Sequence, residues 1–435
     1  MTIRDFIVSA IVLVALPMAL RHPYIGVLLW TWLSLMNPHK LAWGFAVNAP
    51  FAAMAAGATL LGLVITRDRV SLGRDGLVGL LIVFVIWVSF TSVVALDRAE
   101  SLQYLNKVLK IQLMTLVAVA VLHKRAHLEA FVWINVLSLG FFGLKGGIYT
   151  LLTGGTGRVW GPPGGFIEGN NELATALAMS IPLMYYLRHV SRRAWVRHGL
   201  LLVMLMSALS AIGTQSRGAL LAMGAMGALL WWRSSSKLAT LIPIVAVGIL
   251  VFVFMPESWH ERMATIRDYQ EDGSAMGRIN TWGVMLSIAN DRITGGGFGI
   301  YSPWVFSLYT DHKVLAAHSV YFQVLGEQGW IGLLLFLAIW LFAWIKAARI
   351  RTLARRAGDE RGDLATLAAM CQVSMVGYLV GGAFLSLAYF DLPYNIVVML
   401  VVAHRLLLQP AEQKSPSDQR AKPVGAQTGL RPGLR

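Results

Sequence analysis

Cysteine and charged residues are both scarce in this 435-residue chain. The single cysteine, Cys371, lies in an apolar run, which excludes an internal disulfide framework and favours a small buried residue. Only 14% of the residues are charged, whereas a soluble globular protein carries about 25%. The composition therefore excludes an ordinary soluble globular protein.

Apolar residues take the place of the missing charges, at 56% of the chain with a mean hydropathy of +0.62. Backbone polar groups cannot stay unpaired in lipid, so each long apolar run is expected to be helical. The runs fall at roughly 6–20, 24–36, 45–66, 77–96, 104–122, 128–152, 171–187, 199–213, 218–232, 238–255, 319–345, 365–388 and 392–408. The chain is predicted to be an all-α polytopic membrane protein.

The number of spans depends on the first two runs, which are short for independent spans. A hairpin or a broken helix there gives 12 spans and places both termini in the cytoplasm. Thirteen spans would instead place the N-terminus outside. We predict about 12 transmembrane helices.

The distribution of charge predicts the orientation. The net charge of +15 is carried by short loops between apolar runs, which is the positive-inside pattern rather than a nucleic-acid-binding face. Residues 188–198, 346–363 and the tail after His404 are basic and are predicted to be cytoplasmic. Residues 256–317 carry five Lys/Arg against seven Asp/Glu and are predicted to lie outside.

Four regions follow from this reading. Residues 1–255 form the first ten or so transmembrane helices, and residues 256–317 form a large, partly helical periplasmic loop domain. Residues 318–409 form the last transmembrane helices. Residues 410–435, rich in Pro, Gly, Gln and Lys/Arg, are predicted to be a disordered cytoplasmic tail.

Arg217 and Arg278 are the two cations that we single out on the predicted outer side. Arg217 lies in the polar turn Thr-Gln-Ser-Arg-Gly at 214–218, where it either snorkels to the interface or clamps an anion such as phosphate. Arg278 lies in Gly-Arg-Ile-Asn-Thr-Trp at 277–282, which we expect to open a helix and so to favour an anion in its first turn. The glycine-rich run at 295–299 lacks the strand-turn-helix setting of a dinucleotide site.

His318 precedes a long apolar helix at the predicted outer interface. An isolated histidine is commonly a hydrogen-bonded structural residue, but a neutral imidazole there also suits a general base for an acceptor hydroxyl. Glu327, nine residues later, faces another side and is interpreted as structural. No metal-ligand spacing or Gly-x-Ser-x-Gly nucleophile motif occurs, so we predict neither metal nor cofactor.

Together these motifs resemble the O-antigen ligase (WaaL-type) and O-antigen polymerase superfamily. The resemblance rests on the Thr-Gln-Ser-Arg-Gly turn, Gly-Arg-x-x-x-Trp before a glycine-rich loop, and His-Ser with Gly-Glu-x-Gly from 318 to 329. The stretch 22–39 looks more particularly like the O-glycosylation ligase branch.

The resemblance implies a GT-C-like, metal-independent inverting glycosyltransferase of the bacterial inner membrane with its active site facing the periplasm. Its donor would be a glycan on undecaprenyl pyrophosphate and its acceptor a hydroxyl of lipid A-core oligosaccharide. His318 matches the family's essential histidine, and Arg217 and Arg278 match its pyrophosphate-contacting arginines.

Four further residues are candidates for substrate contacts. Arg158 faces the predicted outside and could join the pyrophosphate site. Trp282, Tyr301 and Trp304 could stack on sugar or acceptor groups, although an interfacial aromatic belt explains them equally well.

Two alternatives to lipid A-core ligation stay open. A protein O-oligosaccharyltransferase or an O-antigen polymerase would use the same motifs with another acceptor. A secondary transporter would belong to a different class, but transporter sites lie near the membrane midplane, whereas every candidate here lies on the predicted outer side. The expected partners are the lipid-linked donor, the acceptor and membrane lipids, with no nucleic acid.

Overall fold

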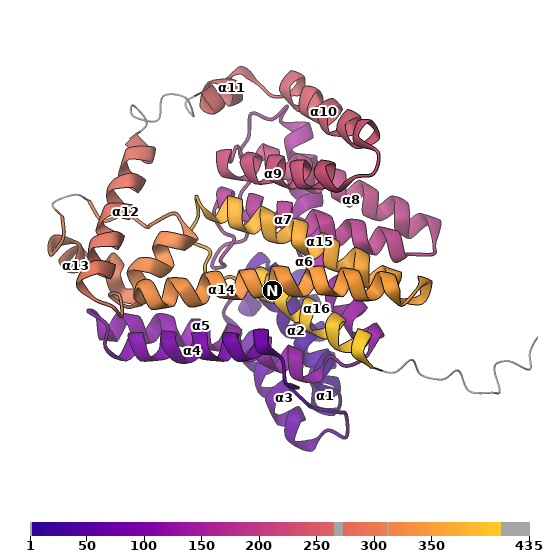
Figure 1. Cartoon of the computed structure of the whole chain (residues 1–435), viewed down its shortest axis with the longest axis horizontal. Coiled ribbons are helices and arrows are strands. Elements are labelled where there is room, and N and C mark those ends of the chain that lie inside the picture. Colours follow the sequence, from indigo (N-terminus) through magenta and orange to yellow (C-terminus); the bar gives the residue numbers. More distant parts are fainter. Residues whose placement is uncertain (1, 265–272, 311–312, 410–435) are drawn as a thin grey trace, which may run out of the picture.

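The computed structural model describes residues 2–264, 273–310 and 313–409, and these residues contain helices and no strands (Figure 1). The all-α prediction is confirmed. The predicted disordered tail at 410–435 and part of the predicted loop domain, 265–272 and 311–312, lie outside the described residues.

The elements follow one another as α1 (Ile3–Arg21), α2 (Pro23–Met36), η1 (Pro38–Leu41), η2 (Phe45–Asn48), α3 (Phe51–Ile65), α4 (Gly76–Val93), α5 (Arg98–Val121), α6 (Arg125–Leu152), α7 (Asn170–Val190), α8 (Ala194–Gly213), α9 (Arg217–Arg233), α10 (Lys237–Phe254), α11 (Glu257–Ala264), α12 (Gly273–Asp291), η3 (Phe298–Tyr301), α13 (Pro303–Ser307), α14 (Val320–Arg356), α15 (Asp359–Gly382) and α16 (Asp391–Leu408).

Each of the thirteen apolar runs corresponds to one α-helix of the structure, and the run 45–66 also includes η2. Nine helices in the described residues are long and apolar enough to cross a membrane, judged by length and composition. Two further apolar helices, α2 and α3, are shorter than these nine, and α7 and α9 correspond to the two remaining runs. The chain is a multi-pass membrane protein, and the figure of 12 spans stays a prediction.

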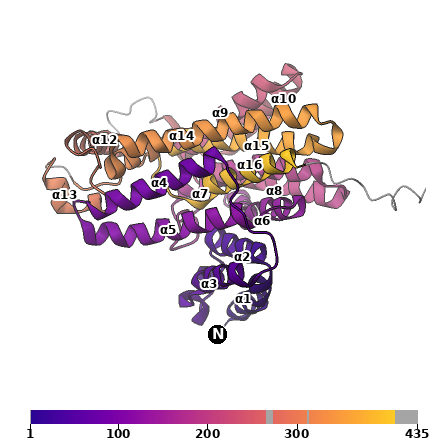
Figure 2. The same ribbon diagram turned by 60° about the horizontal axis from the view of Figure 1, so that its bottom comes forward.

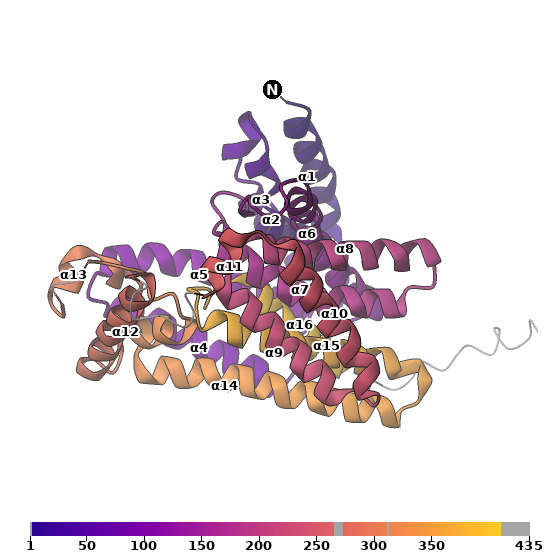
Figure 3. The same ribbon diagram turned by 90° about the horizontal axis from the view of Figure 1, so that it is seen from above.

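Of the two predicted arrangements, a hairpin or a broken helix, the first two helices form the hairpin. A single residue, His22, separates α1 from α2, and Val8 and Val12 of α1 pack with Leu29 and Leu33 of α2 in a small core that the segment after α2 and the start of α3 complete. Figures 2 and 3 show α1, α2 and α3 standing out from the other helices as one group. The short runs are therefore paired with each other.

The other long helices lie side by side in a bundle with two chemically different ends. In Figure 1 α12 and α13 occupy one end, which we call the loop end. At the opposite end α14 finishes and α15 begins, beside the basic segments 188–198 and 346–363 and the end of α16; we call it the basic end. The basic segments thus gather away from the predicted outer loop, as the positive-inside prediction requires.

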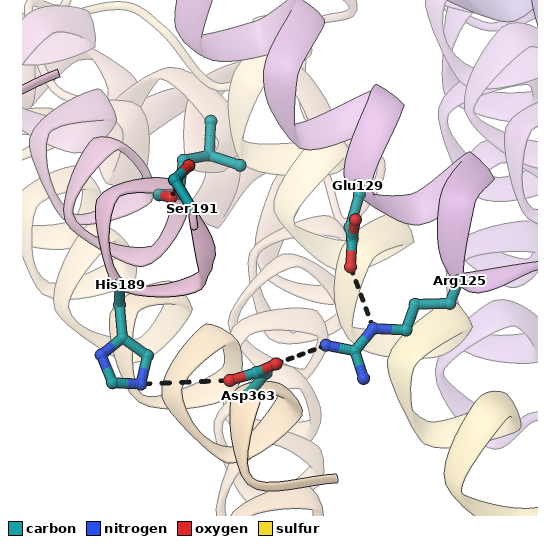
Figure 4. Close-up of polar contacts among 6 residues, drawn as sticks. Arg125, Glu129, His189, Ser191 and Asp363 are labelled. Carbon is teal, nitrogen blue, oxygen red and sulfur yellow. Dashed lines mark hydrogen bonds and ion pairs between the residues drawn. The ribbon is translucent and has the colours of Figure 1, made fainter. Parts of the chain in front are cut away.

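Ion pairs hold helices together at the basic end, as Figure 4 shows. Arg125, which opens α6, donates through Nε to Glu129 one turn later at 2.9 Å and through a terminal nitrogen to Asp363 of α15 at 2.5 Å. His189 at the end of α7 lies 4.0 Å from the other oxygen of Asp363. Three helices distant in sequence therefore meet around one carboxylate.

At the loop end, α14 bends where the glycine-rich run packs against it. Gly329 has a non-helical conformation inside α14, with φ at 67°. The backbone N–H groups of Gly296 and Gly297 donate to the carbonyls of Gly326 and Glu327 at 2.8 and 2.9 Å. A Cβ on Gly295 would lie 2.5 Å from the Gly329 nitrogen, so this run is glycine-rich because two backbones touch there.

Candidate active site at the loop end

A cavity of about 480 Å³ opens at the loop end of the bundle. Five segments distant in sequence line it: α5, the 165–172 stretch, η3, the start of α14 with the residue Ala316 before it, and the 383–390 turn after α15. Its polar and ionisable lining residues are Tyr104, Lys107, Glu168, Glu172, Tyr301, Gln323, Glu327, Ser386 and Tyr389. A concave site with convergent polar groups is where a substrate is expected to bind.

His318 borders this cavity, between the lining residues Ala316 and Ser386. Its backbone N–H donates to the Ser386 hydroxyl at 3.0 Å. Its φ is +44°, a left-handed conformation that non-glycine residues rarely adopt and that costs about 1–3 kcal/mol. Such a conformation persists only where the surroundings fix it, and it occurs preferentially at functional sites.

Trp282 of α12 supplies part of that support. Its indole N–H donates to the carbonyl of Ala317 at 2.7 Å, immediately before His318. Its ring stacks on Phe322 of α14, with centroids 4.8 Å apart and planes 5° from parallel. Trp282 therefore ties α12 to the start of α14 and positions His318, rather than lining the cavity as a predicted sugar contact would.

The environment of His318 favours its neutral form. Burial, followed by the positive charge of Arg278, lowers the pKa of His318 from its ordinary value. Its Nδ1 atom is buried and has no hydrogen-bond partner among the described residues. A neutral imidazole next to a cavity can accept a proton, which is what a general base requires.

Arg278 is the second predicted residue that the structure brings to this place. Its charge acts both on His318 and on Glu172, which lines the cavity. The prediction that Arg278 lies in the first turn of its helix is wrong, because α12 already begins at Gly273 and Arg278 lies in the second turn. An anion there would be held by the side chain and not by free N–H groups at the helix end.

Arg217 reaches the same end through the turn that precedes α9. Asn170, at the start of α7, donates to the carbonyl of Thr214 in that turn at 2.8 Å. The neighbouring Gly218 packs so closely on Phe384 that an added Cβ would lie 3.2 Å from the Phe384 Cβ. The same 384–386 stretch contacts both sides: Phe384 packs on Gly218, and Ser386 accepts from the N–H of His318. This stretch therefore lies between the start of α9 and the histidine.

Arg158 lies elsewhere. It lines a different pocket of about 370 Å³ with Lys145 and Trp160, and its guanidinium carbon sits 5.9 Å from the centre of the Trp160 ring. The next residue, Val159, donates through its backbone N–H to Gly213 at 3.1 Å, so this pocket adjoins the turn before α9. The structure does not bring Arg158 into the cavity beside His318.

The two remaining aromatic candidates differ in position. Tyr301 lines the cavity, and burial raises the pKa of its hydroxyl. Trp304 is 48% exposed, and its indole N–H lies 3.4 Å from a carboxylate oxygen of Asp97, away from the cavity. Only Tyr301 is placed to contact a molecule bound there.

Sequence reasoning missed Lys107 and undervalued Glu327. Lys107 lines the cavity, with its Nζ 3.9 Å above the ring of Phe166 and near the charge of Asp391. Glu327 is 2% exposed, and its side chain accepts from Gln323 at 3.3 Å. A lysine and a glutamate inside apolar helices are costly, which was a usable signal that both face a polar interior.

The described residues contain no group of three or more His, Cys, Asp or Glu side chains that could hold a metal ion. A metal-independent reaction stays a prediction.

Comparison with known families identifies the class of protein. Residues 201–337, which include Arg217, Arg278 and His318, match the model of the O-antigen ligase family. This match supports membership of the O-antigen ligase and polymerase superfamily. Residues 3–192 match a family of unknown function (DUF5935), so Lys107 and Arg158 fall outside the ligase match. No curated protein sequence matches the chain.

The match supports a membrane-embedded, ligase- or polymerase-type glycosyltransferase, and the family implies lipid-linked glycan and acceptor substrates. The ligase match ends inside α14, at residue 337, and so covers only the first part of the segment that follows His318. The cavity draws on both matched regions and on the 383–390 turn beyond them.

The contact between Trp282 and Ala317 can be tested directly. Trp282→Phe removes the indole N–H but keeps an aromatic ring on Phe322. We expect glycan transfer by the purified protein to fall about 10-fold or more, because a small misplacement of a reacting group is costly. Trp304→Phe, which makes the same change at an exposed site, should keep the wild-type rate. Equal rates for the two variants would contradict the positioning role.

Proposed function

We propose that this protein is an O-antigen ligase that moves a glycan from undecaprenyl pyrophosphate to a hydroxyl of lipid A-core oligosaccharide. The observation that carries the proposal is His318, fixed in a left-handed conformation beside a cavity, with Nδ1 unpartnered among the described residues and the charge of Arg278 acting on it. The reaction is proposed to need no metal and to take place on the periplasmic face of the bacterial inner membrane.

Positive charge near the cavity suits a pyrophosphate donor. Arg278 and Arg217 are proposed to contact the pyrophosphate, since a planar guanidinium donates two parallel hydrogen bonds to phosphate oxygens. Lys107 adds a third cation, and it lines the cavity itself. Arg158 lines the neighbouring pocket, so we keep it as a candidate contact to the donor and give it no part in the step at His318.

The transfer step needs one proton acceptor and one stabilised leaving group. His318 takes the proton of the acceptor hydroxyl as the hydroxyl oxygen bonds to the anomeric carbon from the face opposite the pyrophosphate. The bond between that carbon and the pyrophosphate oxygen breaks, and the electron pair leaves on the lipid pyrophosphate. The configuration of the sugar inverts, and the arginines stabilise the charge where it develops.

Protein O-glycosylation and O-antigen polymerisation would use the same step with another acceptor. A secondary transporter would place its site near the middle of the helices. Here the candidate residues gather at the loop end of the bundle, which supports a transferase.

A comparison of acceptors tests the proposal. We expect purified wild-type protein to transfer the glycan of an undecaprenyl-pyrophosphate donor to lipid A-core in the presence of a chelator. His318→Ala should lower that rate by about 10²–10⁴-fold, as removal of a general base does, while the variant elutes and unfolds like the wild type.

A serine- and threonine-containing peptide and a free glycan serve as the competing acceptors in the same assay. Transfer to either in place of lipid A-core would replace the ligase by one of its relatives and keep the chemistry. Full activity of His318→Ala with the preferred acceptor would overturn the role of the histidine.

The pH profile tests the contact between Arg278 and His318 separately. Only the neutral imidazole accepts a proton, so activity is present above the pKa of His318 and is lost as the pH falls through it. Because Arg278 lowers that pKa, Arg278→Gln should move the acid limb of log(kcat/KM) to higher pH.

Arg217→Gln serves as the control in that experiment. It removes a proposed pyrophosphate contact of the same kind, so it should lower the rate and leave the acid limb where it is in the wild type. An acid limb that stays in place in Arg278→Gln would show that the charge of Arg278 does not act on the catalytic base.

A further inference from the structure

A second polar cavity, of about 430 Å³, lies at the basic end, far along α14 from His318. The 69–76 stretch before α4, the later part of α14 and the end of α16 line it. It contains five permanently charged cations and one carboxylate: Arg69, Arg74, Lys346, Arg349, Arg405 and Asp75. The ligase mechanism uses none of them.

Two of the cations are held in place by the fold. Arg405 donates from one terminal nitrogen to the carbonyl of Val119 and from the other to the carbonyl of Leu72, both at 2.8 Å. Lys346 binds Asp75 at 2.7 Å, and both side chains are only 13% exposed. The cavity therefore has a rigid cationic wall whose only carboxylate is already paired.

The other three cations are exposed side chains. Arg69, Arg74 and Arg349 make no hydrogen bond or ion pair with any described residue. The carboxylate of Asp75 attracts Arg405, and the charge of Arg69 repels it to a smaller extent. Like charges gathered around a cavity raise the free energy of the empty site, and an anion would relieve that repulsion.

Phosphate is the anion that best fits these groups. Guanidinium groups present fixed forks of N–H donors that match phosphate oxygens, and several of them can surround one tetrahedral phosphate. The cavity also lies where the apolar helices α14 and α16 approach the basic end, the depth at which phospholipid headgroups meet a membrane protein. Leu72 and Leu408 on its lining could lie against the apolar part of a lipid.

We propose that this basic-end cavity binds a phosphate group, carried either by an anionic phospholipid or by free phosphate. The site lies at the opposite end of the bundle from His318, so it does not depend on the proposed ligase function. The test of this site therefore measures binding of a phosphate-bearing probe and not glycan transfer.

The test uses the full-length protein purified in a mild detergent. Binding is measured from the rise of the thermal unfolding midpoint in titrations with phosphatidylglycerol, with zwitterionic phosphatidylcholine and with inorganic phosphate. We expect saturable stabilisation by phosphatidylglycerol above that by phosphatidylcholine if a lipid supplies the phosphate. Stabilisation by inorganic phosphate without that lipid preference would instead assign a soluble source.

Matched triple variants decide whether the cavity is responsible. Arg69→Gln with Arg74→Gln and Arg349→Gln removes the three cations that form no ion pair with a described residue. Arg192→Gln with Arg193→Gln and Arg197→Gln removes three exposed arginines at the same end, outside the cavity. The first set should weaken binding of the effective probe about 10-fold or more, since several charge-assisted hydrogen bonds are lost, and the second by less than about twofold.

Size-exclusion profiles and unfolding midpoints without added probe establish that both variants fold. Equal weakening in both variants would reduce the effect to general surface charge and overturn the proposal. The absence of any preference for phosphatidylglycerol over phosphatidylcholine, together with no effect of inorganic phosphate, would overturn it as well.

Discussion

Hydrocarbon tolerates neither unpaired backbone polar groups nor isolated charges, and the architecture follows from this constraint. The chain meets it by forming helices in every long apolar run and by gathering ionisable side chains at the two ends of the bundle. The loop end holds His318 and Arg278 beside a cavity, and the basic end holds the ion pairs around Asp363 and a cavity rich in arginine. The chemistry of the protein is therefore divided between two surfaces.

The surroundings of His318 determine both its backbone conformation and its protonation. Its backbone conformation is unfavourable for any residue with a side chain, and two hydrogen bonds from different elements offset that cost. Burial and the nearby guanidinium of Arg278 keep the imidazole neutral. The same guanidinium suits a pyrophosphate, so one arginine can prepare the base and hold the leaving group.

Much of this could be predicted from the sequence, because apolar runs and basic loops are local signals. The thirteen helical runs, the short first pair on either side of His22 and the place of His318 just before α14 all follow from such signals. The contact between Trp282 and Ala317 could not be predicted, since it depends on how α12 docks on α14. Arg158 and His318 are both predicted on the outer side of the membrane, but the side of the membrane does not decide which pocket a residue lines. The position of Lys107 in the cavity could not be predicted either, because the other lining residues come from distant segments.

The central claim is that the loop-end cavity faces the periplasm and receives the lipid-linked donor. Ala316 lines that cavity next to His318, and the only native cysteine, Cys371, is buried. We would therefore label Ala316→Cys, in a Cys371→Ser background, with a membrane-impermeant maleimide in right-side-out and inside-out membrane vesicles. The account predicts labelling in right-side-out vesicles that undecaprenyl-pyrophosphate-linked glycan slows. Labelling confined to inside-out vesicles, or unaffected by the donor, would contradict it.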